Sequence, residues 1–256
     1  MPKILVDLLS YTGTKGGTET YTRELYRQIS QMDSPYEFVG FASKEFMDHD
    51  HSWFPGDVIP SGFSGENRFF WAYGELFGVS AAARRLGADL IHCPAMLGPM
   101  RSSVPVVISM HDLLYFAHPE YMLTGLYTEP VKWMEKRAAA NATRILTISE
   151  ASASDIRKYL KFPSSRTDLV PLAGTVQPRD TERAAITREP ATFLAVGNRR
   201  PHKNFDGLVR AVATIDPAHR PKVIITGSHG EDPLRPLVDE LGVGDSVELL
   251  SWVSAE

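Results

Sequence analysis

Two arginines and a lysine lie together where a strand gives way to a helix, in the segment Gly197-Asn198-Arg199-Arg200-Pro201-His202-Lys203-Asn204. A cation at a helix N-terminus opposes the positive end of the helix dipole, so helix stability does not explain the cluster. A diphosphate would resolve the conflict, because arginine donates as a planar fork and lysine acts as a point charge. We therefore predict a phosphate-binding turn at Arg199, Arg200 and Lys203. A solvated basic loop is the alternative.

A second strand-to-helix turn, near the N-terminus, is rich in glycine. Residues 4–9 indicate a buried strand, and Gly13, Gly16 and Gly17 follow it before a helix begins. Glycines in such a turn let backbone N–H groups approach an anion at the helix N-terminus. The spacing is neither Gly-x-Gly-x-x-Gly nor a P-loop, so a dinucleotide fingerprint is absent. The turn is either an anion site or a tight connection between strand and helix.

A polar pair, His111-Asp112, directly follows the apolar strand predicted at 104–110. In an open α/β sheet the carboxyl ends of the strands face the ligand crevice, so His111 and Asp112 are candidate catalytic residues. A histidine that only braces the strand end is the alternative. His49 and His51 have no further ligand set around them, so we predict solvated loop residues and no metal site.

The elements that position these turns alternate between short apolar runs and helical patterns, which is typical of parallel α/β units. We expect strands at 3–9, 37–41, 89–93, 104–110, 144–148 and 167–171, with helices between them, including 67–86, 126–140 and one capped by Ser149. Residues 42–66 are expected to form a loop. Residues 172–190 contain glycine and prolines without periodicity, which predicts a linker between domains.

The α/β pattern restarts after the linker. Strands are expected at 192–196, 222–226 and 247–250, and helices at 204–215 and 233–241. The sequence thus predicts a Rossmann-like domain at 1–171 and a partial second Rossmann-like domain at 191–256. Because three strands do not complete a doubly wound sheet, we expect the chain to be a truncated part of a longer protein.

The composition excludes some classes of function. The net charge of -4 creates no field that favours nucleic acid. Cys93 is the single cysteine and has apolar neighbours, so we expect a buried structural thiol in a reducing compartment. No apolar run approaches the ~20 residues that cross a bilayer. We expect a cytoplasmic protein with, at most, peripheral contact at the inner membrane face.

Aromatic residues are concentrated in one expected helix. The set is Phe69, Phe70, Trp71, Tyr73, Leu76 and Phe77. Aromatics at helical spacing usually mean burial, so we predict that this helix packs in the core, and Trp133 is interpreted in the same way. A membrane-facing or acceptor-binding helix is the alternative.

Five segments, in order along the chain, resemble the motifs of one enzyme family. They are Gly16-Gly17-Thr18-Glu19, Ser109-Met110-His111-Asp112-Leu113, Leu146-Thr147-Ile148-Ser149-Glu150, Val170-Pro171-Leu172-Ala173-Gly174 and residues 196–204, which end in Pro201-His202-Lys203-Asn204. The chain resembles family 4 of the retaining glycosyltransferases, which have the two-domain GT-B fold. Each motif alone is weak, but five in family order are specific.

The resemblance implies roles for these residues. Gly16 and Gly17 would lie against the donor phosphates or the acceptor, and His111 near the transferred sugar. Lys203, with Arg199 or Arg200, would hold the diphosphate. The other motif residues that we place at the site are Glu19, Ser149, Glu150 and Asn204. No metal or cofactor is implied, because the cations replace a metal at the leaving diphosphate.

The predicted function is transfer of a hexose, of the mannose or glucose type, from a nucleoside-diphosphate sugar to a glycan or lipid-linked acceptor with retention. The ligand would be held between the two domains. The family's Glu-x7-Glu segment would lie beyond Glu256, so we expect weak donor binding and little turnover from this chain alone. One alternative is a non-catalytic nucleotide- or sugar-binding protein. Another, a sugar epimerase or dehydrogenase, would need the missing dinucleotide fingerprint.

Overall fold

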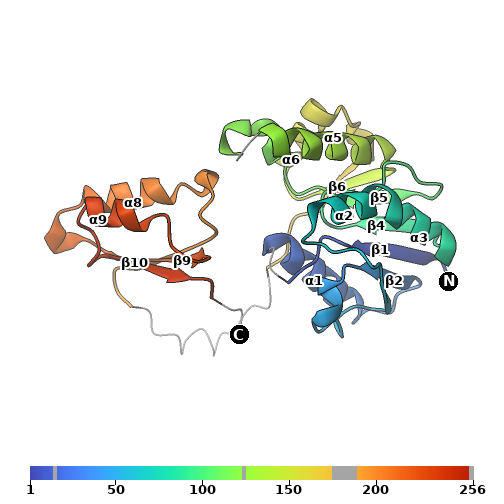
Figure 1. Ribbon diagram of the computed structural model, residues 1–256, viewed down its shortest axis with the longest axis horizontal. Coiled ribbons are helices and arrows are strands. Elements are labelled where there is room, and N and C mark those ends of the chain that lie inside the picture. Colours follow the sequence, from blue (N-terminus) through green and yellow to red (C-terminus); the bar gives the residue numbers. More distant parts are fainter. Residues whose placement is uncertain (14–15, 123–124, 175–188, 254–256) are drawn as a thin grey trace. The chain divides into compact units, whose positions relative to one another are not determined.

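The computed structural model describes residues 1–13, 16–122, 125–174 and 189–253 (Figure 1). The chain divides into two compact units, Met1–Thr175 and Val176–Glu256. Of the predicted linker, residues 175–188 lie outside the described residues. Each unit has its own parallel sheet and its own hydrophobic core, and each is described by itself.

The first unit is built on a sheet of seven parallel strands in the order β3-β2-β1-β4-β5-β6-β7. The strands are β1 (Lys3–Leu8), β2 (Glu37–Ala42), β3 (Asp57–Pro60), β4 (Leu90–Cys93), β5 (Val106–Ser109), β6 (Arg144–Thr147) and β7 (Thr167–Leu169). The strand order reverses at β1, which pairs with β2 on one side and β4 on the other. Open α/β sheets bind ligands at such a reversal, beyond the carboxyl ends of the strands.

Residues 42–66 are not only a loop, so that prediction is wrong in part. Strand β3 pairs in parallel with β2, with Val39 opposite Asp57, and a 3-10 turn spans Glu45–Asp48. A four-residue strand is too short to show the alternation by which strands are recognised. Its hydrogen bonds come from β2, which is distant in sequence, so a local pattern does not reveal it.

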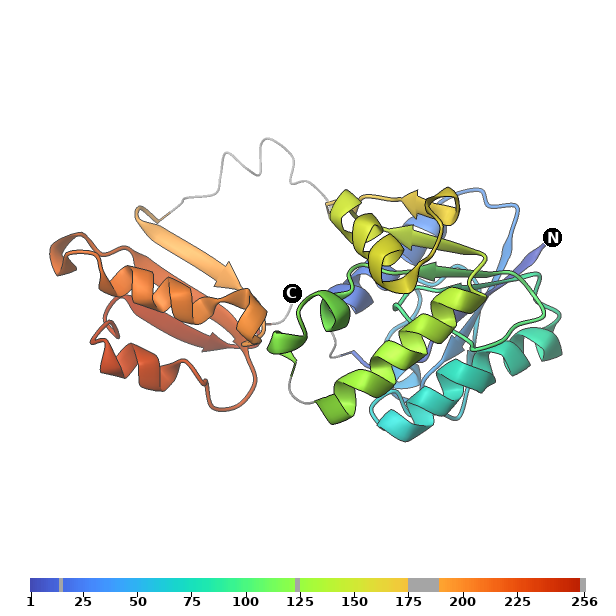
Figure 2. The same cartoon turned by 90° about the horizontal axis from the view of Figure 1, so that it is seen from above.

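Helices cover both faces of the sheet (Figures 1 and 2). They are α1 (Gly17–Ile29), α2 (Arg68–Tyr73), α3 (Val79–Leu86), α4 (Leu114–Ala117), α5 (Gly125–Asn141) and α6 (Glu150–Asp155), with π-helical turns at Gly74–Gly78 and Ile156–Leu160. Helices α3 and α5 and the turn after α6 pack on one face, while α1 packs on the other with residues from 46–54.

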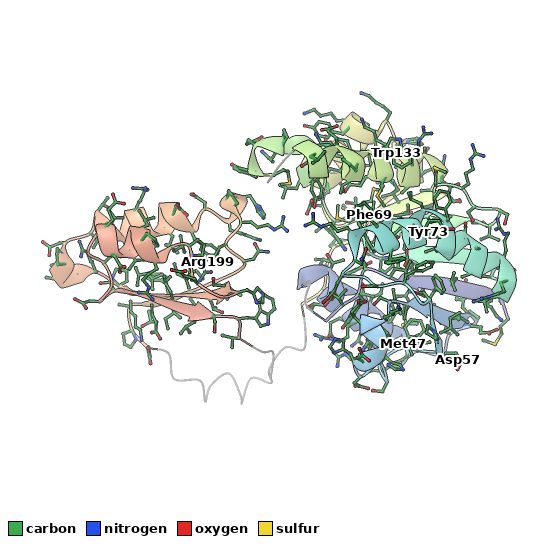
Figure 3. The ribbon with its side chains drawn as sticks, viewed as in Figure 1. Met47, Asp57, Phe69, Tyr73, Trp133 and Arg199 are labelled. Carbon is green, nitrogen blue, oxygen red and sulfur yellow. The ribbon has the colours of Figure 1, made fainter. Side chains whose placement is uncertain are left out.

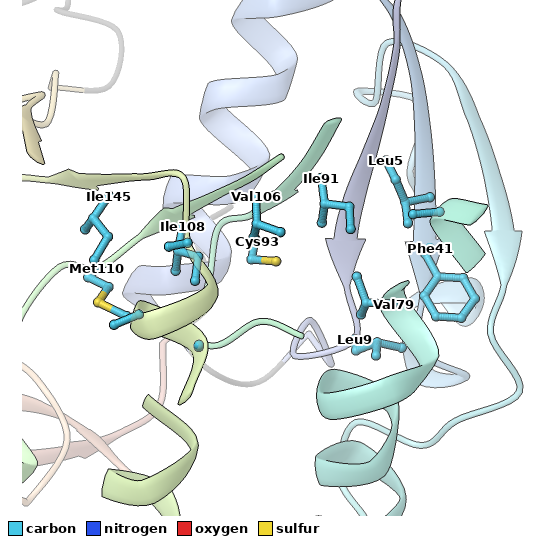
Figure 4. Close-up of a cluster of buried hydrophobic side chains, with 14 of the residues drawn as sticks. Leu5, Leu9, Phe41, Val79, Ile91, Cys93, Val106, Ile108, Met110 and Ile145 are labelled. Atoms are coloured by element: carbon cyan, nitrogen blue, oxygen red, sulfur yellow. The ribbon is translucent and has the colours of Figure 1, made fainter. Parts of the chain in front are cut away.

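The core beneath α3 and α5 is formed by side chains from adjacent strands (Figure 4). Leu5, Ile91, Ile108 and Ile145 come from β1, β4, β5 and β6, and each is fully buried. Cys93 lies among them, and burial raises the pKa of its thiol well above the usual value. The predicted buried thiol is therefore confirmed.

The prediction that the aromatic helix packs in the core is wrong for most of its rings. Phe69 and Tyr73 are 88% and 59% exposed (Figure 3). Phe70 and Phe77 are exposed as well. The helix contacts the core through Trp71 and through small or β-branched residues, listed here as Gly74, Val79, Ala82 and Ala83. Trp133 on α5 is 44% exposed, so its predicted burial is wrong too.

The second unit has three parallel strands in the order β10-β9-β8. They are β8 (Thr192–Val196), β9 (Lys222–Ser228) and β10 (Val247–Ser251), and helices α8 (Phe205–Ala213) and α9 (Arg235–Glu240) pack on the same face of the sheet (Figure 1). This arrangement matches the predicted partial Rossmann-like unit. In the described part of the chain β8 is an edge strand, and Leu194 and Val196 are exposed on it.

Candidate functional site

Arg199 follows β8, and its side chain makes its hydrogen bonds and its ion pair within the second unit. Only 6% of its side chain is exposed, and Nη2 lies 2.7 Å from Oδ2 of Asp232. Nε also donates to Asp232, while the remaining N–H groups donate to the carbonyl oxygens of Gly197, Ile225 and Thr226. These bonds use all five donors of the guanidinium. Arg199 therefore holds the turn together and has no donor left for a phosphate.

The other two cations of the turn remain available. Arg200 and Lys203 are exposed, and neither side chain makes an ion pair or hydrogen bond with any other described residue. Between them runs a 3-10 turn, Pro201–Lys203. Of the two arginines left open as phosphate ligands by the sequence, the geometry thus favours Arg200.

Backbone geometry shapes this turn. Asn204 has φ 52° and ψ 38°, the left-handed conformation that asparagine tolerates better than most residues, and it lies between the 3-10 turn and α8. Gly227, at φ +102°, packs against the turn, because a Cβ at this position would lie 2.6 Å from the carbonyl oxygen of Gly197. Asn204 therefore sets the direction of the chain after Lys203.

The glycine turn of the first unit is held by Glu19. This buried carboxylate accepts hydrogen bonds from the backbone N–H groups of Thr12 at 2.6 Å and Gly13 at 3.1 Å. Gly16 adopts φ 68°, and a Cβ at Gly17 would meet no atom within 4 Å. The first turn of α1 therefore has open space beside Gly17, and Glu19 has a structural role in holding the preceding turn.

His49 belongs to the same turn, which the sequence did not indicate. Its Nε2 lies 3.2 Å from the carbonyl oxygen of Thr12, and a Cβ at Gly13 would overlap the His49 ring at 2.3 Å. His49 is exposed, as predicted for a loop residue, but it packs directly over Gly13. Gly13 is thus required by a neighbouring side chain as well as by its φ of +83°.

His111 follows β5 with both imidazole nitrogens buried and without a hydrogen bond to any described residue. Burial lowers the pKa of His111, while Asp112 and the backbone of Pro94 partly oppose the change. The imidazole is therefore neutral near pH 7, with a proton on only one of its two nitrogens.

The backbone around His111 is fixed from β6 and α6. Thr147 Oγ1 donates to the carbonyl oxygen of Met110 at 2.7 Å, and Ser152 Oγ donates to that of His111 at the same distance. Ser149 caps α6 by accepting from the Ser152 backbone N–H at 3.1 Å, which confirms the predicted cap. Glu150 lies in the first turn of α6 and is exposed.

Two carboxyl groups, those of Asp112 and Glu135, belong to the region that follows β5. Asp112 is exposed, and its Oδ1 accepts from the backbone N–H of Leu114 at the start of α4. Glu135 on α5 is buried, and its Oε2 makes no hydrogen bond to a described residue. Burial first, and then the charge of Asp112, raises the pKa of Glu135 to about 8. Glu135 was not singled out from the sequence, although it is an acid between the apolar positions Met134 and Ala138.

Comparison with solved structures identifies the fold class of this protein. One solved structure with this arrangement is the lipopolysaccharide outer core galactosyltransferase WaaB, with a TM-score of 0.59, 17% identity, and coverage of 100% of this chain and 69% of that chain. A UDP-GlcNAc 2-epimerase from Methanocaldococcus jannaschii has a TM-score of 0.56 at 12% identity, covering 98% of this chain and 74% of that one. The fold is that of the GT-B glycosyltransferases, and the epimerase shows that this fold alone does not decide the reaction.

Family models identify the family of the chain. The model described as Glycosyltransferase Family 4 matches residues 15–173, and the model described as Glycosyl transferases group 1 matches residues 176–256. Because the first match covers more than half of the chain, the chain belongs to this glycosyltransferase family.

A curated relative is similar over much of the chain. It is an alpha-D-kanosaminyltransferase from Streptomyces kanamyceticus, 24% identical over 213 residues, which are 73% of this chain and 55% of the relative. The chain therefore spans about half the length of this relative. Within the described residues, no helix is both long and apolar enough to cross a membrane.

Proposed function

We propose that this chain supplies the acceptor domain and the phosphate-binding turn of a retaining glycosyltransferase. The enzyme would transfer a hexose, of the mannose or glucose type, from a nucleoside-diphosphate sugar to a glycan or lipid-linked acceptor in the cytoplasm. Membership of the glycosyltransferase family supports the reaction class, and the name of the kanosaminyltransferase describes transfer of a sugar. No cofactor takes part in this proposal.

The observation that carries the proposal is the pair of free cations at the second turn. Arg200 and Lys203 are exposed and have no carboxylate partner among the described residues, on a turn that Arg199 and Asp232 hold together. Charge on the leaving diphosphate grows in the transition state, and cations fixed beforehand stabilise it without reorganisation. We assign the diphosphate to Arg200 and Lys203, with Asn204 setting the backbone that presents Lys203.

In the first unit we assign the transferred sugar to His111. Its neutral imidazole lies at the carboxyl end of β5 with both ring nitrogens buried, so an atom beside the ring has to move before a sugar hydroxyl can reach them. Asp112 and the open turn at Gly16 and Gly17 complete this site. Ser149 and Glu150 lie at the N-terminus of α6, where Ser152 braces the backbone of His111.

Thermal stabilisation tests the diphosphate assignment. UDP-glucose, GDP-mannose, dTDP-glucose and the free diphosphates UDP, GDP and dTDP are added to the purified chain, and the midpoint of unfolding is measured. A bound ligand stabilises by RT ln(1 + [L]/Kd), about 2.7 kcal/mol at 100 Kd. Lys203→Ala should abolish the response, and Arg210→Ala, which removes an exposed cation of α8, should retain it. An unchanged response of Lys203→Ala would refute the assignment.

Transfer itself separates the enzyme from a non-catalytic binding protein. The protein is incubated with the sugar nucleotide that stabilises it, and release of the nucleoside diphosphate is followed. Release that is lost in His111→Ala supports a transferase. Binding without release would favour the binding protein. The configuration of the new glycosidic bond, read by NMR, tests retention.

A further inference from the structure

A chain of four polar side chains runs from the interior of the first unit to His111. The Tyr26 hydroxyl hydrogen-bonds to Nδ1 of His92, and Nε2 of His92 lies 3.1 Å from Oγ of Ser109. Ser109 Oγ is 3.0 Å from the hydroxyl of Tyr21. The Tyr21 ring then meets the His111 ring edge-on, with centroids 4.5 Å apart and an interplanar angle of 79°. Helix α1 and strands β4 and β5 contribute these residues.

The interior groups fix the direction of the hydrogen bonds. Burial, with a smaller contribution from His111, lowers the pKa of His92 to about 4, so its ring is neutral and has a single N–H. Tyr26 is buried, and in the described part of the chain its hydroxyl has no acceptor other than His92 Nδ1. Tyr26 therefore donates to Nδ1, because otherwise its buried hydrogen would have no acceptor.

The same reasoning continues outward. With Nδ1 accepting, the proton of His92 is on Nε2 and is donated to Ser109 Oγ. Ser109 is also buried, and the Tyr21 hydroxyl is the remaining described acceptor for its hydrogen. The opposite direction would leave the Tyr26 hydrogen unsatisfied. The hydrogen of Tyr21, which is only partly buried, is the one that the interior does not use.

We infer that Tyr21 donates this hydrogen to an oxygen of the sugar bound at His111, and that Tyr26, His92 and Ser109 hold its hydroxyl in the donating orientation. This inference rests on the proposed function, because it takes the ligand at His111 to be a sugar. Tyr21 is thus a sugar-binding residue, and the three interior residues are positioning residues. A hydroxyl already fixed by the interior loses little freedom when the ligand binds.

The direction of the hydrogen bonds can be tested without a ligand. Histidine labelled with ¹⁵N is incorporated into the chain, and the tautomer of His92 is read by NMR. We expect a proton on Nε2 and none on Nδ1 across the neutral pH range. Tyr26→Phe removes the donor that fixes the tautomer, so a mixture of tautomers is expected in that variant. A proton on Nδ1 of the wild-type ring would overturn the inference.

Binding tests the contact with the sugar. Kd is measured by calorimetry for the sugar nucleotide of the thermal panel that binds best and for its free diphosphate. Loss of one hydrogen bond should weaken sugar-nucleotide binding by Tyr21→Phe about 5-fold, on the order of a neutral hydrogen bond. Diphosphate binding should not change. Tyr36→Phe, which removes an exposed hydroxyl of the same unit, is the control.

The outcomes separate this inference from the function on which it rests. If Lys203→Ala abolishes binding while Tyr21→Phe binds sugar nucleotide as the wild type does, the inference is wrong and the proposed function stands. If the wild type binds none of the compounds, both fail. A loss of diphosphate affinity in Tyr21→Phe equal to the loss for the sugar nucleotide would also refute a contact with the sugar.

Discussion

Replacing Arg199 with alanine should strongly destabilise the second unit and leave the stability of the first unit unchanged. The substitution removes the hydrogen bonds that join the end of β8 to the end of β9 and to Asp232. It also leaves the carboxylate of Asp232, whose side chain is 12% exposed, without its cation. Breaking a buried ion pair on one side costs about 3–5 kcal/mol. That loss is comparable with the whole stability of so small a unit.

Hydrogen exchange followed by mass spectrometry resolves the effect by segment. A loss of about 3 kcal/mol raises the opening equilibrium roughly 100-fold, so peptides from β9 and β10 should exchange at least that much faster. Peptides from β1 to β7 should be unchanged, because Arg199 bonds only to residues of its own unit. Arg199→Lys should give an intermediate effect, since lysine keeps the charge but cannot fork.

Arg200→Ala is the matched control for this prediction. Arg200 is exposed and makes no ion pair with a described residue, so its removal should change stability by less than about 0.5 kcal/mol. It should instead weaken diphosphate binding. Exchange in β9 that stays within a factor of three of wild type in Arg199→Ala, or that rises equally in Arg200→Ala, would refute the division of roles between the two arginines.

Substitutions at three further positions test other parts of the structure. Glu135→Gln mimics the protonated acid. Because the pKa of Glu135 is about 8 in the folded state and 4.5 in the unfolded state, the stability of the wild type falls as the pH rises from 4.5 towards 8. The difference in melting temperature, variant minus wild type, should therefore increase over this pH range. Glu19→Ala should cost about 1–3 kcal/mol in urea unfolding, because the buried N–H of Thr12 and the partly buried N–H of Gly13 lose their acceptor, whereas Glu19→Gln should retain most of the stability. Phe70→Ala should change the urea midpoint little, since the ring is exposed; a loss of 3–5 kcal/mol would instead indicate a buried ring.

The order of elements could be predicted because most strands are buried runs separated by helical patterns. Strands such as β1, β5 and β9 appear within a few residues of their predicted bounds. The aromatic helix was misjudged because much of its sheet-facing side consists of small residues such as Gly74 and Ala83, which contribute little to a hydrophobicity pattern. Trp71 packs against the core, but most of the other rings are exposed, so the larger apolar residues indicated the wrong face.

The positions of the site turns could also be predicted, because the carboxyl ends of parallel strands meet at one edge of each sheet. The choice between Arg199 and Arg200 could not, because it depends on Asp232, which is 33 residues from Arg199. The hydrogen-bonded series from Tyr26 to Tyr21 could not be predicted either, because Tyr26 and His92 are 66 residues apart in the sequence. They meet through the pairing of β1 with β4 and the packing of α1 on the sheet.

The unpaired edge of β8 affects how firmly the turn that we assign to the diphosphate is held. Strand β8 leads directly into the Gly197–Lys203 segment, yet in the described residues it is anchored along one side only, by β9. An unpaired strand edge with exposed leucine and valine attracts another strand. A strand that paired with this edge would make the backbone of β8 and of the following turn more rigid. The turn would then lose less conformational entropy when an anion binds to it. Ligand affinity and strand docking should therefore strengthen each other, and two copies that paired through this edge would make affinity depend on protein concentration.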